Sequence, residues 1–375
     1  MVKFLHTADW QLGMRRHFLE GEAQARFSAA RLDVIERMGR LAVDEGCEFV
    51  VVCGDVFESN QVERAVLRRA LERMAETPSV TFYLLPGNHD PLDASSIYTS
   101  PTFRESRPDN VKALVSSEPV ESTAGVELIA APWPNKRPVT DLVDVVCQGL
   151  ESADSVRIVV GHGAVDSLSG YARGPGLIGL GQLEEKIEAG LIQYVALGDR
   201  HSTTEVGDTG RVWYAGAPEP TDYVEVDPGN VLVVDVDTDS VNVESRSVGV
   251  WKFERRDWNL SGGADIDAFE EWLGGLTKKD LSIVKVGFTG QLSLAQKARL
   301  DGILEYNGDL LAALETWERR SDLVVVPDEV DVDQLGLSGF AQAALVELRQ
   351  FAESGDNDGE AQDALGLLYR LARPQ

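Results

Sequence analysis

The chain has 375 residues, of which 43% are hydrophobic and 26% are charged, a composition typical of a soluble globular protein. This length predicts two domains, or one large domain with appendages. No apolar run approaches the roughly 20 residues that span a bilayer, and Met1 leads directly into an alternating stretch instead of a secretory signal. We therefore expect a cytoplasmic protein without a membrane segment.

The net charge bears on possible partners. The formal value is −27, from 62 acidic and 35 basic residues. It weighs against a large nucleic-acid-binding surface, because affinity for a phosphate backbone comes mostly from Lys and Arg. Carboxylates that hold divalent cations are offset by bound positive charge, however, and a partner subunit can also supply the grip on DNA.

The cysteines Cys47, Cys53 and Cys147 show no metal-ligand spacing. Two of them lie in or beside apolar segments, so we interpret all three as reduced core thiols, with a disulfide as the alternative.

The first two-thirds of the chain alternates β-rich runs with amphipathic helical patterns, which predicts an α/β fold. Predicted strands are 3–7, 49–53, 80–85, 126–131, 157–160 and 194–197, and predicted helices are 23–45, 62–76, 139–150 and 181–189. Three further strands at 212–215, 231–236 and 241–245 are expected to close a second sheet.

The pattern changes near Val248. A strand at 282–289 and helices at 265–273 and 294–306 predict a small α/β accessory domain that ends near Val326. An acidic linker at 327–334 precedes two amphipathic helices at 337–351 and 360–371. Such a hairpin is too small to bury both apolar faces, so it either docks on a partner or packs on its own chain. The expected domains are 1–248, 249–326 and 335–373.

Residues that bind divalent metals follow five of the predicted strands. The carboxyl ends of strands in an α/β sheet meet at one edge, so residues far apart in sequence come together there. The candidate residues are Asp9, Asp55, Asn88, His89, His162, Asp199 and His201.

Each motif is weak by itself, but all five in this order favour a site with two metal ions. Phosphodiester hydrolysis requires an activated water, neutralised phosphate oxygens and in-line geometry, which two neighbouring metal ions provide. One carboxylate must bridge them. Asp55 is the candidate, because it lies in the middle of the series and directly follows the most apolar strand.

The motif order resembles the calcineurin-like metallophosphoesterases. The segments His6-Thr7-Ala8-Asp9-Trp10, Leu84-Leu85-Pro86-Gly87-Asn88-His89-Asp90 and Trp213-Tyr214-Ala215-Gly216-Ala217-Pro218-Glu219-Pro220 are more specifically similar to the SbcD-type repair nucleases. That resemblance covers about Val2 to Val248. It implies a four-layer αββα sandwich with a small α/β capping domain and a C-terminal helical hairpin.

The resemblance also implies roles for the site residues. One metal is held by Asp9, Gln11, Asp55 and His201, and the other by Asp55, Asn88, His162 and Asp199. His89 is the general acid that protonates the leaving oxygen. The implied cofactors are two divalent ions, usually Mn²⁺, and the implied partners are DNA, an SbcC-like coiled-coil ATPase that binds the C-terminal hairpin, and a second copy of the chain.

Three positions depart from the family pattern. Gln11 and Asp199 stand where histidine is usual, and Glu58 stands where aspartate is common. Asp199 can still bind metal, whereas the neutral amide of Gln11 is a weaker ligand than imidazole.

Three functions therefore remain open: a DNA exonuclease and endonuclease subunit, a phosphoesterase of a small ester or cyclic nucleotide, and a catalytically impaired scaffold.

The roles of several aromatic and basic residues are open as well. Trp10, Trp133, Trp213 and Tyr214 either stack on nucleotides or serve packing. The basic residues Lys252, Arg255 and Arg256 either contact DNA or form a solvated face. Whether the segment 14–17, near the expected rim of the active site, contacts a phosphate group is also left open.

Overall fold

The computed structural model describes residues 1–168, 176–326, 339–353, 361, 364 and 367–368. The chain divides into two compact units. Unit 1 comprises Met1–His17 and Gln24–Trp251, and unit 2 comprises Phe18–Ala23 and Lys252–Gln375.

The first sheet of unit 1 has six strands in the order β12-β11-β1-β2-β3-β4. Strands β1 to β4 are parallel to one another, whereas β11 is antiparallel to β1 and β12 to β11. Their bounds are β1 (Val2–Thr7), β2 (Phe49–Val52), β3 (Thr81–Leu84), β4 (Val111–Ala113), β11 (Asn230–Val236) and β12 (Val241–Ser247).

The second sheet has six strands in the order β5-β6-β7-β8-β10-β9. Strands β6, β7, β8 and β10 are parallel, and the two edge strands are antiparallel to their neighbours. The bounds are β5 (Val120–Thr123), β6 (Val126–Ala130), β7 (Val156–His162), β8 (Tyr194–Gly198), β9 (Thr204–Glu205) and β10 (Val212–Tyr214).

One expectation about these sheets was wrong. Of the strands predicted at 212–245, only β10 joins the second sheet, and β11 and β12 extend the first. The reason is burial, because six of the seven residues of β11 are buried. A strand that is apolar on both faces is stabilised when both faces are covered. Pairing with β1 places Val231 and Val233 in the cluster under the helices and Leu232, Val234 and Val236 in the cluster between the sheets.

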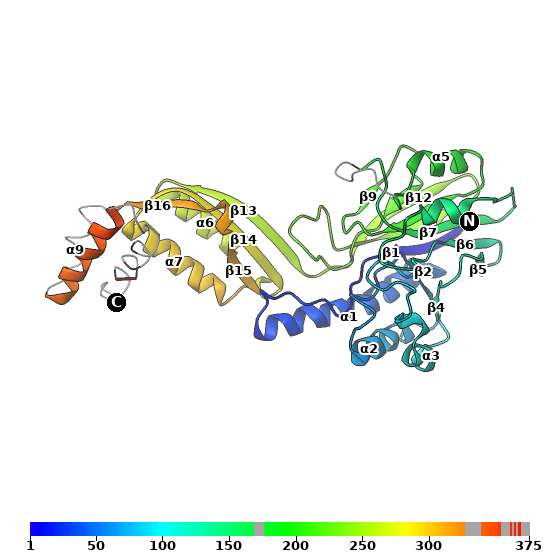
Figure 1. Cartoon of the computed structure of the whole chain (residues 1–375), viewed down its shortest axis with the longest axis horizontal. Coiled ribbons are helices and arrows are strands. Elements are labelled where there is room, and N and C mark those ends of the chain that lie inside the picture. The colour runs from blue at the N-terminus through cyan, green and yellow to red at the C-terminus, as the bar shows by residue number, and fades with distance from the viewer. Residues whose placement is uncertain (169–175, 327–338, 354–360, 362–363, 365–366, 369–375) are drawn as a thin grey trace. The chain divides into compact units, whose positions relative to one another are not determined.

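Three apolar clusters separate four layers in unit 1 (Figure 1). The first cluster joins α1 (Gly21–Asp44), α2 (Arg64–Ala75) and α3 (Pro101–Ser106) to the first sheet. The second lies between the sheets, where the Phe4 and Phe49 rings stack 5.2 Å apart. The third joins α4 (Leu142–Cys147) and α5 (Leu180–Glu188) to the second sheet. The expected αββα sandwich is therefore confirmed.

Unit 2 is built on a four-stranded parallel sheet. Helices α6 (Gly263–Gly275) and α7 (Leu294–Gly308) contribute Phe269, Leu273, Leu300 and Ile303 to its core. The strands are β13 (Lys252–Leu260), β14 (Ser282–Ser293), β15 (Ala313–Thr316) and β16 (Asp322–Val326), and the short helices of the chain are η1 (Ile97–Thr99), η2 (Lys279–Leu281) and η3 (Glu318–Arg320).

At the C-terminal end, α9 (Phe340–Glu353) is the first of the two predicted helices. Its Leu345 packs with Leu294, Ala298 and Val325 of the same unit, whereas Phe340 is 90% exposed. The predicted linker lies outside the described residues, and so does most of the second predicted helix. None of the helices in the described ranges is long and apolar enough to cross a bilayer.

Candidate metal centre

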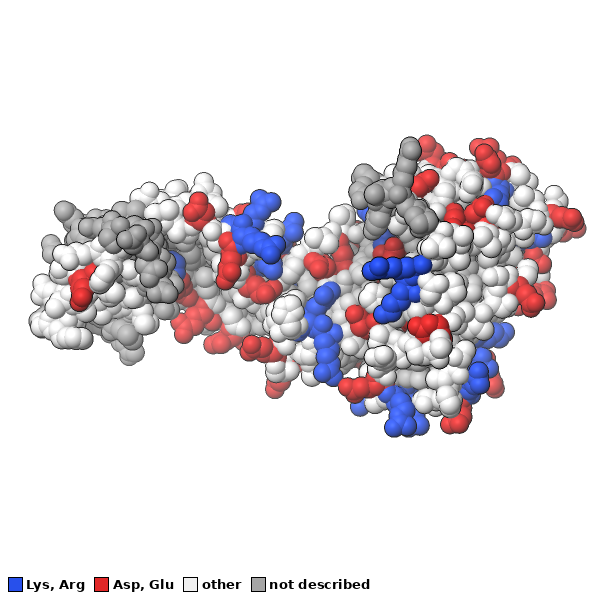
Figure 2. Space-filling model, in the orientation of Figure 1, with Lys and Arg blue, Asp and Glu red and all other residues white. Residues whose placement is uncertain are grey.

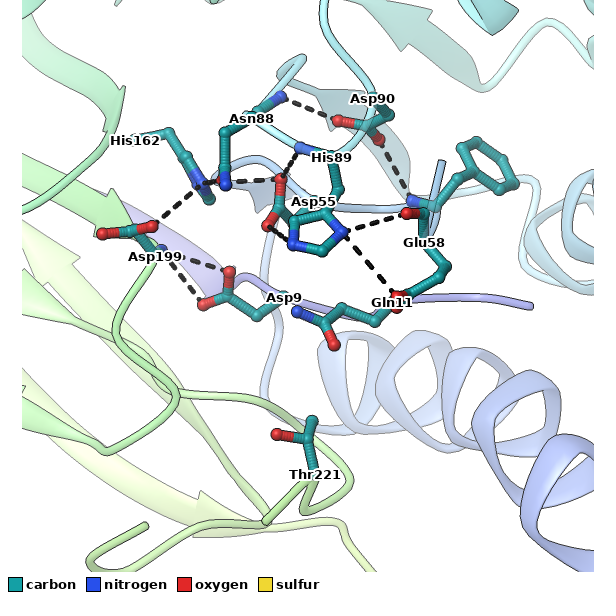
Figure 3. A network of polar contacts seen from close by, with 12 residues as sticks. Asp9, Gln11, Asp55, Glu58, Asn88, His89, Asp90, His162, Asp199 and Thr221 are labelled. Atoms are coloured by element: carbon teal, nitrogen blue, oxygen red, sulfur yellow. Dashed lines mark hydrogen bonds and ion pairs between the residues drawn. The ribbon is translucent and has the colours of Figure 1, made fainter. Parts of the chain in front are cut away.

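The predicted ligands lie where strands of the two sheets end. Asp9 follows β1, Asp55 follows β2 and Asn88 follows β3, all in the first sheet, while His162 ends β7 and Asp199 follows β8 in the second. Figure 3 shows Asn88, His162 and Asp199 on one side of Asp55 and Gln11 on the other. One potential ligand atom each of Asp9, Asp55 and His162 lies within 4.8 Å of the other two.

The backbone of this edge is strained at several of these residues. Asp9, Gln11, Asp55 and Asp199 all have left-handed φ angles, of 54°, 46°, 53° and 96°. Such a conformation costs a residue other than glycine of order 1–3 kcal/mol and persists only where the surroundings impose it. Here the backbone N–H of Asp9 donates to the Gly54 carbonyl (3.1 Å), and the backbone N–H of Gln11 donates to the Asp55 carbonyl (2.9 Å). The β1 and β2 loops therefore hold each other in place.

Glycines permit the close approach of these loops. A Cβ atom on Gly54 would lie 2.2 Å from His162 Nδ1, and one on Gly198 would lie 1.9 Å from the Cys53 carbonyl oxygen. Both distances are far below van der Waals contact. The glycines of the Gly-Asp motifs therefore bring the two sheets close enough to share one site.

Three acceptor atoms converge on the His162 side of Asp55. His162 Nδ1 donates to the Cys53 carbonyl (2.8 Å), which leaves the Nε2 lone pair facing Asn88 Oδ1 at 2.7 Å and Asp55 Oδ1 at 3.5 Å. A cation between such acceptors satisfies all of them. The amide of Asn88 also fits when reversed, because its nitrogen then donates to His162 and Asp55.

The Gln11 side has a similar arrangement. His201 Nδ1 lies 2.9 Å from Glu225 Oε1, and its Nε2 lies 3.0 Å from Gln11 Nε2. Gln11 is 2% exposed, and its Oε1 has no hydrogen-bond partner among the described residues. A buried acceptor without a partner is costly, and this oxygen is a suitable ligand for a hard cation. The residues present on both sides therefore fit divalent metal ions.

The electrostatics of the cluster also favour added positive charge. Burial raises the pKa of Asp9 to about 7, with nearby histidines opposing the shift, and burial likewise raises the pKa of Asp199. Burial lowers the pKa of His162, but Asp55, Asp199 and Asp9 outweigh it and raise that pKa to about 9. The carboxylates thus stabilise a proton on the imidazole, and a divalent cation would supply the same compensation more strongly.

His89 faces the site without joining either set. Its backbone amide donates to Asp55 Oδ1 (2.9 Å), and its Nδ1 lies 2.9 Å from the Glu58 carbonyl oxygen. The side chain is 36% exposed, with Nε2 4.0 Å from Asp55 Oδ2. This position suits proton transfer to a bound substrate.

Sequence reasoning missed several supporting residues. Glu225 and Thr221 contact His201, and the buried Asp90 accepts hydrogen bonds from the Gly87 and Phe57 amides and from the Tyr98 hydroxyl. Asp90 stands inside the Gly-Asn-His-Asp motif, so the motif was the signal for it. Glu225 carries no motif, because it reaches His201 only through the folded loop.

The aromatic candidates contact protein groups. The Trp133 indole N–H donates to the His162 carbonyl (2.7 Å), the Trp10 indole to Thr7 (3.0 Å) and the Tyr214 hydroxyl to the Gly163 carbonyl (2.6 Å). These contacts favour packing and support over nucleotide stacking. All three cysteines are free and buried, as expected.

Comparisons with known proteins agree with this geometry. The calcineurin-like phosphoesterase family model matches residues 2–202, more than half of the chain, so the protein belongs to this family of phosphoester hydrolases.

More specific relatives match only in part. The SbcD component of the SbcCD nuclease is 30% identical over 94 residues in Rhodobacter capsulatus, which is 24% of this chain and 22% of that protein. In Bacillus subtilis it is 28% identical over 98 residues, or 25% and 24% of the two chains. The chain thus aligns with about a quarter of the length of these relatives.

Two solved structures are also similar. They are the TT1561 protein of Thermus thermophilus (TM-score 0.42, 12% identity, 66% of this chain and 99% of that one) and a dimetal phosphatase from Danio rerio (TM-score 0.40, 11% identity, 66% and 96%).

Proposed function

We propose that this protein is a two-metal-dependent DNA phosphodiesterase, with exonuclease and endonuclease activity, that processes DNA ends in double-strand break repair together with an SbcC-like ATPase. The observation that carries the proposal is the pair of acceptor sets on either side of Asp55, at the edge where the family motifs meet. The partial similarity to the SbcD component of the SbcCD nuclease supports DNA as the substrate.

Each group of residues has its own role in the proposed reaction. Two divalent cations, of which Mn²⁺ is our candidate, would supply an activated water and neutralise the nonbridging phosphate oxygens. We assign Asp9, Gln11, Asp55 and His201 to one cation, and Asp55, Asn88, His162 and Asp199 to the other. His89, held through its Nδ1 by the Glu58 carbonyl, donates a proton from Nε2 to the leaving oxygen.

Unit 2 offers a surface for the DNA backbone. The guanidinium of Arg255 lies 5.0 Å and that of Arg320 5.4 Å from the Trp317 ring, and Arg256 lies 4.3 Å from the Trp258 ring. Stacking on a ring orients a guanidinium and leaves its N–H groups available for phosphate. Figure 2 shows basic side chains gathered in a few places while acidic ones are spread over the surface. DNA binding therefore requires a local basic surface.

Two further partners follow from the same proposal. The ATPase would bind α9, where Phe340 and Val346 are 90% and 50% exposed. A second copy of the chain would dimerise through α1 and α2, which follow the first two metal motifs.

Specific observations favour two other functions. The net charge of −27 favours a phosphoesterase of a small ester or cyclic nucleotide, because such a substrate needs no extended basic surface. The amide of Gln11, a weaker ligand than imidazole, favours a scaffold with impaired catalysis.

The test is Mn²⁺-dependent cleavage of linear duplex DNA by the full chain, with and without a coexpressed SbcC-like partner. Small phosphate esters serve as competing substrates and an Asp55→Ala variant as the control. Degradation of duplex DNA that the substitution abolishes supports the nuclease. Cleavage of small esters alone supports the second function, and no cleavage by a folded, metal-loaded protein supports the scaffold.

A further inference from the structure

The two sides of Asp55 have the same donor composition. With the ligands assigned above, each side has two carboxylates, one amide and one imidazole. In that assignment, Asp55 and Asp199 belong with Asn88 and His162, and Asp55 and Asp9 belong with Gln11 and His201. The departures at Gln11 and Asp199 create this equality, because each replaces an imidazole by an oxygen donor.

The contacts repeat as well as the composition. On one side the Asn88 amide group meets His162 Nε2 at 2.7 Å, and on the other the Gln11 amide group meets His201 Nε2 at 3.0 Å. With the Asn88 amide reversed, its nitrogen donates to His162 Nε2, as Gln11 Nε2 does to His201 Nε2. Gln11 Oε1 is without a partner among the described residues. Each side thus presents one imidazole nitrogen beside one amide.

Each imidazole is also oriented from behind. The Cys53 carbonyl holds His162 Nδ1 at 2.8 Å, and Glu225 Oε1 holds His201 Nδ1 at 2.9 Å. An oxygen on the far nitrogen fixes the tautomer and turns the Nε2 lone pair towards a metal. The side chain of Glu225 is 4% exposed, so the group that orients His201 is shielded from solvent.

We propose that this chain binds hard divalent cations, Mg²⁺ and Mn²⁺, at both positions, and that its preference for Zn²⁺ and Fe²⁺ is reduced because Gln11 and Asp199 leave one imidazole on each side. Carboxylate and amide oxygens suit Mg²⁺ and Mn²⁺, whereas imidazole suits Zn²⁺ and Fe²⁺. This inference rests on the proposed two-metal function and specifies its cation.

The experiment measures metal binding without a substrate. Mn²⁺ is titrated into chelator-treated full-length protein, free Mn²⁺ is followed by electron paramagnetic resonance, and Mg²⁺ or Zn²⁺ is then added as competitor. We expect Mg²⁺ to displace Mn²⁺ from both positions of the unmodified chain. In Gln11→His, the ratio of Zn²⁺ to Mn²⁺ affinity should rise at least about tenfold, the lower end of what even outer-shell changes do to metal affinity.

Control variants separate this effect from a general one. The left-handed φ of 46° at Gln11 is one that histidine tolerates, so Gln11→His is expected to fold. Gln11→Glu adds an oxygen donor instead and should raise the Mn²⁺ affinity while leaving Zn²⁺ selectivity low. Gln291→His adds an imidazole at an exposed position of β14 and should change neither affinity.

The outcomes are distinguishable. An affinity ratio that stays the same in Gln11→His, or Mn²⁺ that Mg²⁺ cannot displace, overturns the inference while two bound metals still support the proposed function. A folded protein that binds no divalent cation overturns both.

Discussion

In the proposed metal centre, the two sides of Asp55 have the same kinds of donor, but their histidines are oriented by different groups. On the His162 side, the imidazole is oriented by the main-chain carbonyl of Cys53, directly after the fully buried strand β2. On the His201 side, it is oriented by the side chains of Glu225 and Thr221. One ligand is therefore positioned by the backbone of the core and the other by side chains of a loop. Side-chain substitutions should affect the two sides unequally.

The largest effect on the rate of hydrolysis is expected from Asp55→Asn, because we assign Asp55 to both cations. Asn tolerates the left-handed φ of 53° at this position, so the backbone should be retained. Metal ions contribute several kcal/mol to the stabilisation of transition-state charge, and losing that contribution lowers hydrolysis by on the order of 10³-fold or more. The measurement is initial cleavage rate together with Mn²⁺ stoichiometry. A variant with unchanged rate would remove Asp55 from its bridging role.

His89→Asn should leave metal binding unchanged on both sides of Asp55. His89 contacts Asp55 through its backbone amide, which the substitution keeps. The loss of a general acid lowers the rate by about 10²–10⁴-fold, while Mn²⁺ binding stays as in the unmodified chain. Steady-state kinetics and a metal titration on the same preparation test this. Weaker metal binding in His89→Asn would show that this histidine is a ligand or supports one.

Glu225→Gln should weaken metal binding on the His201 side of Asp55 only. Glu225 accepts from Thr221 and lies 2.9 Å from His201 Nδ1, and outer-shell carboxylates of this kind are worth about 10–100-fold in metal affinity. We expect one of two bound Mn²⁺ ions to weaken by that factor and the other to be unchanged, as measured by titration calorimetry. Glu244→Gln, an exposed position on β12, is the control. Equal weakening of both ions would contradict the separation of the two sides.

His6 should make the stability of the fold depend on pH. It lies 3.1 Å from the Tyr194 hydroxyl and from the Leu197 carbonyl oxygen, and so links β1 to β8. Burial lowers its pKa from 6.5 to about 3. Between these values the unfolded chain binds a proton that the folded chain does not. The contribution of neutral His6 to stability is therefore complete above pH 6.5 and declines as the pH falls towards 3.

The decline is at most about 1.4 kcal/mol per pH unit. Urea unfolding of the unmodified chain and His6→Gln at pH 8, 7, 6 and 5 tests this. The stability difference between them should be constant at the two higher values and should shift against the unmodified chain at the two lower ones. A constant difference at all four would show that His6 is not held neutral.

Cys53→Ala should give the smallest effect and complete the contrast with Glu225. Cys53 holds His162 only through its carbonyl oxygen, so the substitution should leave Mn²⁺ affinity unchanged within the error of a titration. The buried thiol is lost from the core between the sheets, at a cost of about 1 kcal/mol in unfolding free energy. Thermal unfolding and calorimetry measure the two quantities. A clear loss of affinity would contradict support by the main chain alone.

The sequence by itself determined much of unit 1. The apolar runs of β1, β2, β3, β6, β7 and β8 were predicted within one or two residues, because a strand buried on both faces leaves a continuous hydrophobic signal. The order of strand-end motifs likewise predicted which side chains meet at one edge, since parallel strands bring their carboxyl ends together.

Only the tertiary structure decided how these parts combine. The sheet that β11 joins depends on which long-range partner covers both of its faces, and no local pattern encodes that choice. The same is true of Glu225, which reaches His201 because a loop folds back across 24 positions of sequence. The left-handed backbone at Asp9, Gln11 and Asp55 also arises from hydrogen bonds between loops. Residue type and spacing record local preference and burial, whereas pairing between distant segments is fixed only when the whole chain packs.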